Sequence, residues 1–170
     1  MNFKKYIRDI PDFPSKGVVY KDITPLLNDA MAMKQATEAL VQLLDNQEVD
    51  TVVGMESRGF LFGPLLAARL NAGFVPVRKP GKLPAEKISL SYDLEYGTDT
   101  LEIHKDAIRK GDRILIHDDV LATGGTAKAT CVLVERLGGN IVQCNFLIEL
   151  GFLKGREKLS SYEVKSLMDY

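Results

Sequence analysis

The sequence predicts an α/β fold in which helices flank a central, mostly parallel sheet. Strand-like and helix-like segments alternate over the last two-thirds of the chain, as they do where a crossover helix follows each strand of a parallel sheet. The strand-like segments are short, rich in Val and Ile and largely unbroken in apolar character, which is typical of strands buried on both faces. With 170 residues and no internal repeat or linker-like tract, we expect one domain that spans residues 1–170.

The elements of this sheet layer can be placed by their pattern. The expected strands are, in chain order, 51–55, 74–77, 113–117 and 141–150. A helix is expected from Asp29, a good capping residue, to about Asn46. The segment 60–70 is apolar almost all round, which suits a buried helix, and the segment 126–137 carries an apolar stripe and stops at a pair of glycines.

The segment 80–106 differs from the rest of the chain. It is polar, contains Gly81, Pro84 and Gly97, and alternates weakly in the stretches ISLSYDL and TDTLEIH. This pattern predicts a hairpin-like excursion with an exposed, flexible tip. Excursions of this kind often act as lids over active sites.

The charges of the chain are balanced, with 22 Lys and Arg against 23 Asp and Glu and a formal net charge of −1. This balance lacks the positive excess of a nucleic-acid binder, but a local cluster can still hold a small anion. No apolar run approaches the roughly 18 residues of a membrane helix, and the first residues lack the apolar core of a signal peptide. Cys131 and Cys144 lie in apolar stretches and are interpreted as core thiols. We therefore expect a cytoplasmic protein with no membrane or nucleic-acid partner.

The segment from Arg113 to Thr126 carries the strongest functional pattern. A hydrophobic strand runs into two adjacent carboxylates, then into a short loop ending in ATGGT, and then into a helix. Ligands of open α/β sheets bind at the carboxyl ends of the strands. Glycines let backbone N–H groups approach a phosphate, threonines add hydroxyl donors, and a helix N-terminus favours an anion. The sequence therefore predicts a phosphate site here. Because GxxxxGK[ST] and GxGxxG are both absent, this site is not expected to be a P-loop or a dinucleotide fold.

The carboxylates Asp118 and Asp119 need a separate explanation, because they would repel a phosphate if they pointed at it. They fit as acceptors of hydrogen bonds from the hydroxyl groups of a sugar whose phosphate lies in the glycine loop. The alternative is a strand-end turn with a helix cap, since Asp, Thr and Gly all favour turns. The order of apolar strand, two carboxylates, glycine loop and helix favours the sugar-phosphate interpretation.

A second anion site is expected at residues 56–59 (ESRG), which follow the first strand and open the apolar helix. Arg78, Lys79 and Lys82 follow the next strand and add three cations. Beside a polyanionic substrate, these cations would stabilise a leaving pyrophosphate. The alternatives are a helix-capping turn with a surface Arg and a solvated charged face.

The stretch DDVLATGGT resembles the signature of the type I phosphoribosyltransferases, which bind 5-phosphoribosyl 1-pyrophosphate. Blocks that resemble the adenine phosphoribosyltransferases follow one another in the right order over nearly the whole chain: PDFPSKGVVYKDITPLL, ESRGFLFGP, RKPGKLP, SYDLEYG, LEIHKDAI, DDVLATGGTA and LKGREKL. The resemblance implies a type I phosphoribosyltransferase fold, with a small base-binding hood to which residues 1–28 contribute and a flexible catalytic loop at residues 80–106. It also implies a purine-salvage reaction that transfers the 5-phosphoribosyl group to adenine and gives AMP and pyrophosphate.

The resemblance also implies a role for each part of the site. The residues implied to hold the 5-phosphate are Ala122, Thr123, Gly124, Gly125 and Thr126. Those implied to hold the ribose hydroxyls are Asp118 and Asp119. Those implied to bind pyrophosphate are Glu56, Ser57, Arg58, Arg78, Lys79 and Lys82. A non-proline cis peptide is expected within this group, between its first two members. The residues implied to bind adenine are Val19, Tyr20, Lys21 and Leu150.

For catalysis, the resemblance implies that Glu95 handles a proton of the purine and that Tyr96 shapes the closed loop, while Arg58 assists the leaving group. A glutamate in a loop is otherwise most often solvated. Two positions depart from common members of the family, which often have Phe at Tyr20 and Arg at Lys21. Tyrosine preserves stacking on the base, whereas lysine lacks the planar guanidinium fork.

The implied cofactor is Mg²⁺, held mainly through the substrate rather than by a dedicated protein site. No pattern of His and Cys suits zinc, and we interpret His104 and His117 as structural. The resemblance further implies a homodimer in which Arg78 reaches the site of the second copy.

Two other functions stay open on the sequence. The first is a phosphoribosyltransferase for another base, such as hypoxanthine, guanine, xanthine or orotate. The second is a regulatory protein that keeps the pocket as a sensor and binds DNA or RNA, because fold alone does not settle function. The balanced charge and the complete set of loop residues argue against the second.

Overall fold

The structure is a computed structural model that describes residues 1–93 and 97–170 of the chain. The chain forms two compact units, Met1–Ala39 and Leu40–Tyr170, and each is described here by itself. The expectation of one domain over residues 1–170 stays a prediction. Within the described residues, no helix is long and apolar enough to cross a membrane.

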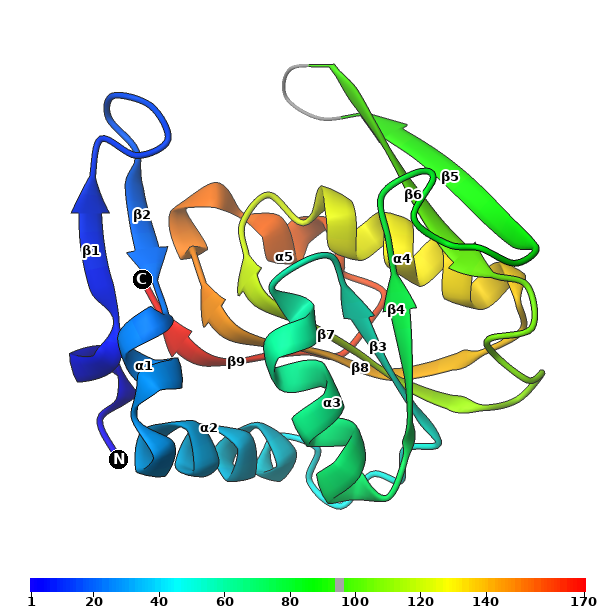
Figure 1. The fold of residues 1–170 in the computed structure, drawn as a ribbon, viewed down its shortest axis with the longest axis horizontal. Helices are drawn as coiled ribbons and strands as arrows, with labels where there is room; N and C mark the ends of the chain where they lie inside the picture. The colour runs from blue at the N-terminus through cyan, green and yellow to red at the C-terminus, as the bar shows by residue number, and fades with distance from the viewer. Residues whose placement is uncertain (94–96) are drawn as a thin grey trace. The chain divides into compact units, whose positions relative to one another are not determined.

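The first unit contains two short helices, a two-stranded hairpin and the start of a longer helix (Figure 1). Its elements are η1 (Phe3–Tyr6), β1 (Arg8–Pro11), β2 (Val19–Asp22), α1 (Thr24–Asn28) and α2 (Ala30–Gln42). Strands β1 and β2 pair in antiparallel fashion, and the Asp29 carboxylate accepts a hydrogen bond from the Ala32 N–H at 2.8 Å, as a capping residue does. Helix α2 ends at Gln42 rather than near Asn46, because Asp45 and Asn46 adopt the left-handed backbone conformation.

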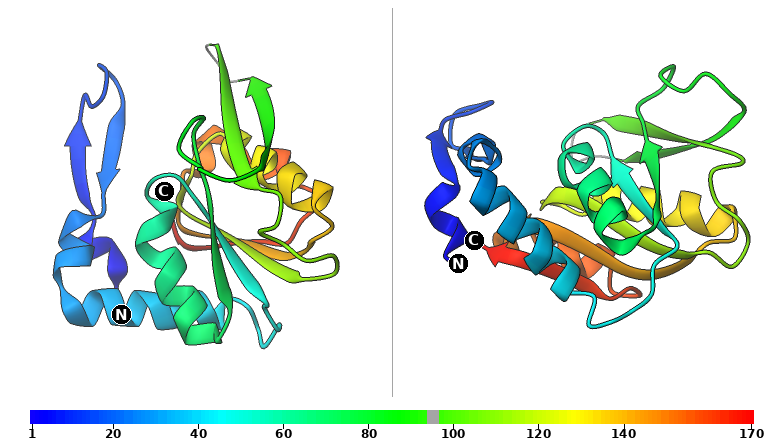
Figure 2. Two further views of the ribbon diagram at one scale, coloured as in Figure 1. Left: turned by 45° about the vertical axis from the view of Figure 1, so that its right-hand side comes forward. Right: turned by 60° about the horizontal axis from the view of Figure 1, so that its bottom comes forward.

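The second unit is built on a sheet of five parallel strands, in the order β4-β3-β7-β8-β9. The strands are β3 (Thr51–Met55), β4 (Gly73–Val77), β7 (Arg113–Leu121), β8 (Asn140–Glu149) and β9 (Val164–Asp169). Helices α3 (Gly59–Leu70) and α4 (Gly125–Arg136) connect β3 to β4 and β7 to β8. Since these connections run in opposite directions along the sheet and crossovers are right-handed, the two helices cover opposite faces (Figure 2).

The expected fold is confirmed, with two differences in the strands. Strand β7 continues past residue 117 to Leu121, because the ladder with β8 runs on through the pairs Asp118↔Phe146 and Val120↔Ile148. Strand β9 is not among the strands expected from the sequence, since its stretch VKSLMD mixes polar and apolar residues. As an edge strand it needs no continuous apolar run.

The expected hairpin is present in the part of 80–106 that the structure describes. Strands β5 (Lys87–Asp93) and β6 (Thr98–His104) pair in antiparallel register and lie beside α4 (Figure 2). Leu101 and Ile103 of β6 are fully buried in the cluster that also contains residues of α4. The base of the excursion is therefore part of the core, while its tip, residues 94–96, lies outside the described residues.

Helix α3 differs from the expectation that it is buried all round. Phe62 and Leu66 are fully buried against the sheet, but Leu61 is 41% exposed and Leu65 36% exposed. Pro64 and Ala68 lie on the same exposed side, at helical spacing. The apolar sequence of α3 would mean burial all round only if another segment covered its outer face, and no segment of the described residues does so.

The two cysteines are buried and free, as expected, with their Sγ atoms 3.7 Å apart. Two short helices, η2 (Gly151–Leu153) and α5 (Gly155–Lys158), connect β8 to β9.

Candidate active site

The candidate site lies where β3, β4 and β7 end. The chain leaves β3 toward one side of the sheet and β7 toward the other, so the loops that follow these two neighbouring strands diverge. Ligands of open α/β sheets bind at such a point. The predicted phosphate loop follows β7, and the predicted pyrophosphate loops follow β3 and β4 (Figure 1). The parallel sheet therefore brings segments 56–58, 78–82 and 118–126 to one edge.

The phosphate loop connects β7 to the first turn of α4. Gly124 has φ of +78°, a conformation that side-chain-bearing residues rarely adopt. The loop also packs against Gly155: a Cβ on Gly124 would lie 2.4 Å from the Gly155 carbonyl oxygen, and a Cβ on Gly155 would lie 2.2 Å from the Ala122 carbonyl oxygen. Two glycines from distant parts of the chain thus let the loop take this shape.

A small cavity of about 80 Å³ lies at this loop. Its lining residues are Asp118, Val120, Leu121, Ala122, Thr123, Gly124, Gly125, Thr126, Ala127 and Phe146. All five residues predicted to hold a 5-phosphate therefore line one cavity at the N-terminus of a 12-residue helix. The first backbone N–H groups of a helix and its dipole both favour an anion there.

The acidic pair lies within β7 rather than in the loop after it. Asp118 is among the residues that line the phosphate cavity. Asp119 is only 2% exposed, and its Oδ2 lies 3.0 Å from Nε of Arg58. Gly59 permits this approach, because a Cβ there would lie 2.8 Å from the His117 carbonyl oxygen. The predicted leaving-group arginine and one predicted sugar carboxylate are therefore an ion pair in this structure.

The pKa values of the two carboxyl groups are raised by their surroundings. Burial raises the pKa of Asp118 well above its usual range, and the negative charge of Asp119 adds to this effect. Burial also raises the pKa of Asp119, although the Arg58 guanidinium opposes it. Hydrogen-bond donors that arrive with a ligand would favour the ionised forms of both groups.

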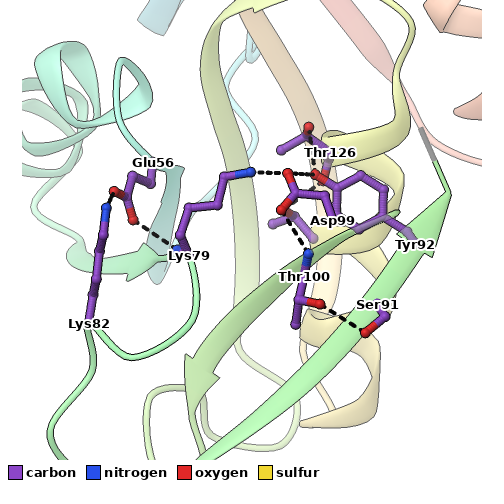
Figure 3. Close-up of polar contacts among 9 residues, drawn as sticks. Glu56, Lys79, Lys82, Ser91, Tyr92, Asp99, Thr100 and Thr126 are labelled. Atoms are coloured by element: carbon purple, nitrogen blue, oxygen red, sulfur yellow. Dashed lines mark hydrogen bonds and ion pairs between the residues drawn. The ribbon is translucent and has the colours of Figure 1, made fainter. Parts of the chain in front are cut away.

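The Glu56 carboxylate organises the loops after β3 and β4. It accepts a hydrogen bond from the Lys79 backbone N–H at 2.8 Å and forms an ion pair with Lys82 (Figure 3). It also pairs with Nε of Arg78 at 3.3 Å. Burial acts to raise the pKa of Glu56, but these donors outweigh it and hold the pKa below its usual value. The expected cis peptide between Glu56 and Ser57 is present.

Lys79 and the phosphate loop contact the β5–β6 hairpin (Figure 3). The Lys79 ammonium forms an ion pair with Asp99 of β6, and the Tyr92 hydroxyl of β5 lies 3.1 Å from Oγ1 of Thr126. Tyr92 also donates a hydrogen bond to Asp99 at 3.3 Å. The sequence analysis singled out neither Tyr92 nor Asp99, because their partners in the proposed site, Thr126 and Lys79, are 34 and 20 residues away and no local pattern marks such contacts.

The residues predicted to bind the base fall in both units. Val19, Tyr20 and Lys21 follow one another on β2, where the Tyr20 ring packs edge-on against Phe13 at 5.2 Å and Lys21 donates to Asp9 at 2.7 Å. Leu150 follows β8 in the second unit, and its N–H donates to the Leu121 carbonyl oxygen at 2.9 Å. Their joint role at adenine stays a prediction.

The predicted catalytic Glu95 and its neighbour Tyr96 lie outside the described residues. The two histidines are described. His117 is fully buried with its Nδ1 2.8 Å from Oδ1 of Asn145, as a structural side chain would be. His104 closes β6, and its Nε2 accepts from the Ala85 N–H at 3.4 Å.

The chain was compared with known proteins. Residues 21–169 match the family model of the phosphoribosyl transferase domain. The adenine phosphoribosyltransferase of Flavobacterium johnsoniae is 63% identical over 170 residues, which cover 100% of both chains. Among solved structures, the adenine phosphoribosyltransferase of Thermoanaerobacter pseudethanolicus is 56% identical with a TM-score of 0.97, covering 99% of this chain and 98% of that one.

The enzyme of Saccharomyces cerevisiae, solved with an imino-altritol bisphosphate and adenine, is 44% identical with a TM-score of 0.92, covering 97% of this chain and 96% of that one. Both the sequence match and the structural match extend over almost the entire chain, including the segments that form the site. This chain therefore belongs to the phosphoribosyl transferase domain family and, within it, to the adenine phosphoribosyltransferases.

Proposed function

We infer that this chain is an enzyme of purine salvage that transfers the 5-phosphoribosyl group of 5-phosphoribosyl 1-pyrophosphate to adenine and releases AMP and pyrophosphate. The observation that carries this inference is the small cavity at the start of α4, which has Asp118 among its lining residues and cation-bearing loops on the neighbouring strands. The substrate needs these three features at one edge of the sheet: the cavity for its 5-phosphate, the aspartate for its sugar hydroxyls and the cations for its pyrophosphate.

The donor would be held from both ends. Backbone N–H groups and hydroxyls of residues 122–126 donate to the 5-phosphate, while Asp118 and Asp119 accept from the ribose hydroxyls. Arg58 forms an ion pair with Asp119 in the structure, which supports a position for Arg58 beside the proposed sugar site. This arrangement fixes the ribose relative to both anionic groups, which is the orientation that a displacement at its C1 atom requires.

Departure of pyrophosphate leaves an oxocarbenium-like ribose, as in glycoside hydrolysis. The negative charge that develops on the leaving group is stabilised by Arg58, Arg78, Lys79 and Lys82, with Ser57 as a further donor. Glu56 does not bind the anion directly in this proposal. Its carboxylate aligns Arg78 and Lys82, as its contacts in the structure support.

The base side of the reaction is proposed from the resemblance of the sequence blocks. Tyr20 and Leu150 stack on the two faces of adenine, and Val19 and Lys21 present backbone groups to its edge. Glu95 receives or delivers the proton of the purine ring, and Tyr96 helps to close the loop, which excludes water from the activated sugar.

Mg²⁺ is the proposed cofactor. The carboxylate oxygens of Asp118 and Asp119 are hard donors that suit this ion, but no group of three or more potential ligands occurs among residues 1–93 and 97–170. Substrate oxygens would therefore supply most of its coordination. When bound, Mg²⁺ neutralises negative charge on the pyrophosphate group.

We also propose that the enzyme is a cytoplasmic homodimer. The exposed apolar side of α3, formed by Leu61, Pro64, Leu65 and Ala68, follows directly on the Arg58 loop and suits a second copy of the same surface. Arg78 would reach the site of that copy. Two buried thiols 3.7 Å apart that remain unlinked fit a reducing compartment.

The test is product formation from the donor, Mg²⁺ and each of five bases: adenine, hypoxanthine, guanine, xanthine and orotate. AMP is expected to form with a kcat/KM for adenine far above that for the others. Preference for an oxopurine or orotate would contradict the adenine assignment, and no product with any base would favour a binding or sensing role.

A matched pair of variants links this activity to the site. Asp119→Asn should raise the KM for the donor at least about tenfold, because it weakens charge-assisted hydrogen bonds to the ribose. Asp106→Asn removes the same charge at an exposed position and should leave the KM unchanged. Equal KM values for the two variants would remove Asp119 from the sugar site.

A further inference from the structure

Asp99 lies between two groups that the proposed site needs for its substrate. Its Oδ2 atom pairs with the Lys79 ammonium, which belongs to the proposed pyrophosphate loop. The same Oδ2 accepts a hydrogen bond from the Tyr92 hydroxyl at 3.3 Å, and that hydroxyl lies 3.1 Å from Oγ1 of Thr126 in the phosphate loop (Figure 3). A single carboxylate on β6 thus connects the two loops that are proposed to bind the two ends of 5-phosphoribosyl 1-pyrophosphate.

The directions of these hydrogen bonds follow from the protons available. A tyrosine hydroxyl has one proton, and Tyr92 donates it to Asp99, so the Thr126 hydroxyl donates to Tyr92. Lys79 and Thr126 are therefore both donors that point toward the hairpin. Phosphate oxygens would accept from these same two donors, so the hairpin and the substrate compete for them.

The hairpin does not need Asp99 for its own pairing. Strands β5 and β6 are joined by a ladder of seven residue pairs, and Leu101 and Ile103 anchor β6 in the core. The ion pair itself is partly open to solvent, with the Lys79 side chain 40% exposed and that of Asp99 21% exposed. Ion pairs this open contribute little to the stability of a fold.

Asp99 also differs from Glu56, the other carboxylate beside these cations. Glu56 belongs to the loop after β3 and bonds the backbone N–H of Lys79 as well as the side chains of Arg78 and Lys82, so it shapes the loops. Asp99 reaches in from the hairpin and contacts only the Lys79 side chain among the three cations in the described chain. The Lys79 ammonium can therefore exchange Asp99 for another anion without any rearrangement of the loops.

We propose that Asp99 is an internal competitor of the pyrophosphate group for Lys79. This inference rests on the proposed function, because it needs Lys79 to bind pyrophosphate. The carboxylate holds the ammonium in the substrate-free enzyme and is displaced when the donor binds. Asp99 is thus a positioning residue that lowers the affinity for pyrophosphate and speeds the exchange of ligands on Lys79.

The experiment measures the affinity of the full-length enzyme for Mg²⁺-pyrophosphate by titration calorimetry. Asp99→Asn keeps the size of the side chain and an acceptor for the Thr100 N–H but removes the charge that competes for Lys79. It should tighten pyrophosphate about two- to fivefold, the range expected for a partly exposed ion pair. In steady-state assays the KM for the donor should fall, while the KM for adenine stays unchanged.

Asp93→Asn is the matched control, since it removes one negative charge from the same hairpin at an exposed position. If it tightens pyrophosphate as much as Asp99→Asn does, the effect is general electrostatics and the inference is overturned. Asp99→Glu restores a carboxylate and should return the affinity toward that of the original chain. An affinity that stays at the Asp99→Asn value in this variant would also contradict competition.

Lys79→Ala separates failure of this inference from failure of the proposed function. If Lys79→Ala leaves the affinity for pyrophosphate unchanged, Lys79 is not in the pyrophosphate site and both ideas fall at this residue. If it weakens pyrophosphate but Asp99→Asn brings no gain, the site assignment stands and the competition is excluded. Where the inference holds, Asp99→Asn brings no gain once Lys79 is alanine.

Discussion

His117 and Asp119 lie two residues apart on β7, and both are buried titratable side chains. Asp119 has a cation beside it, whereas His117 has only the Asn145 amide at Nδ1, and its Nε2 has no partner among the described residues. Because Asn145 Oδ1 accepts, Nδ1 carries the proton of a neutral ring. Burial lowers the pKa of His117 to about 4, although the hydrogen bonds with Asn145 act in the opposite direction.

This difference predicts a loss of stability in mild acid. The unfolded chain takes up a proton at the ordinary histidine pKa of about 6.5, while the folded chain does so only near 4. The neutral His117 ring therefore makes its full contribution to the free energy of unfolding above about pH 6.5. As the pH falls toward 4 this contribution declines, and at pH 5 the free energy of unfolding is lower by roughly 2 kcal/mol.

Urea unfolding at pH 7 and pH 5 measures this contribution. The original chain should lose about 2 kcal/mol more between these pH values than His117→Gln, which cannot titrate. His104→Gln controls for the removal of a histidine elsewhere. Equal losses in the original chain and in His117→Gln would show that the ring is not held neutral by the fold.

At the scale of elements, the phosphate loop depends on a helix that follows β8. Gly155 begins α5 and lies against Ala122 and Gly124, so the short C-terminal helix supports the loop between β7 and α4. Sequence reasoning noted LKGREKL as a block of family likeness but had no physical reason for its glycine. The reason is a contact between segments about 30 residues apart, which no local pattern reveals.

Gly155→Ala should therefore damage donor binding without removing a polar group. The added Cβ would lie 2.2 Å from the Ala122 carbonyl oxygen, so the backbone of the phosphate loop must move. A rise of at least about tenfold in the KM for the donor is expected, together with a loss of about 1–3 kcal/mol in stability.

Gly151→Ala is the matched control, because a Cβ there meets nothing closer than 3.6 Å. Steady-state kinetics and thermal unfolding of both variants provide the comparison. If Gly155→Ala binds the donor as Gly151→Ala does, the loop adapts to the extra carbon and the support from α5 is not required.

The elements that the sequence predicted well share one property. Strands such as β3 and β8 are buried on both faces, so their apolar runs mark them within one residue at each end. The acidic pair looked like the start of a loop because Asp is rare in strands, yet pairing with β8 keeps it within β7. Edge strand β9, the exposed side of α3 and the Lys79–Asp99 contact depend on tertiary partners, and sequence pattern carries no signal for them.

At the scale of the whole molecule, the exposed side of α3 predicts the oligomeric state. Leu61 and Leu65 lie one turn apart on this side, and a lysine between two copies would bury an unpaired charge. Leu65→Lys should therefore convert the proposed homodimer into monomers, as measured by light scattering coupled to size-exclusion chromatography.

Met31→Lys makes the same change at a methionine that is 59% exposed on α2 and should leave the mass unchanged. An original chain that elutes with the mass of one copy would contradict the homodimer. A Leu65→Lys variant that remains dimeric would place the interface elsewhere.

The pairing of β3 with β7 has a consequence for the time at which the site can form. Asp50 and Arg113 meet at the start of this pair although they are 63 positions apart in the chain. During synthesis, the loop after β3 therefore leaves the ribosome well before the strand that it must lie beside. A nascent chain cannot bring the two anion loops together at one edge of the sheet until residue 126 has emerged, so ligand-assisted folding can act only late in translation.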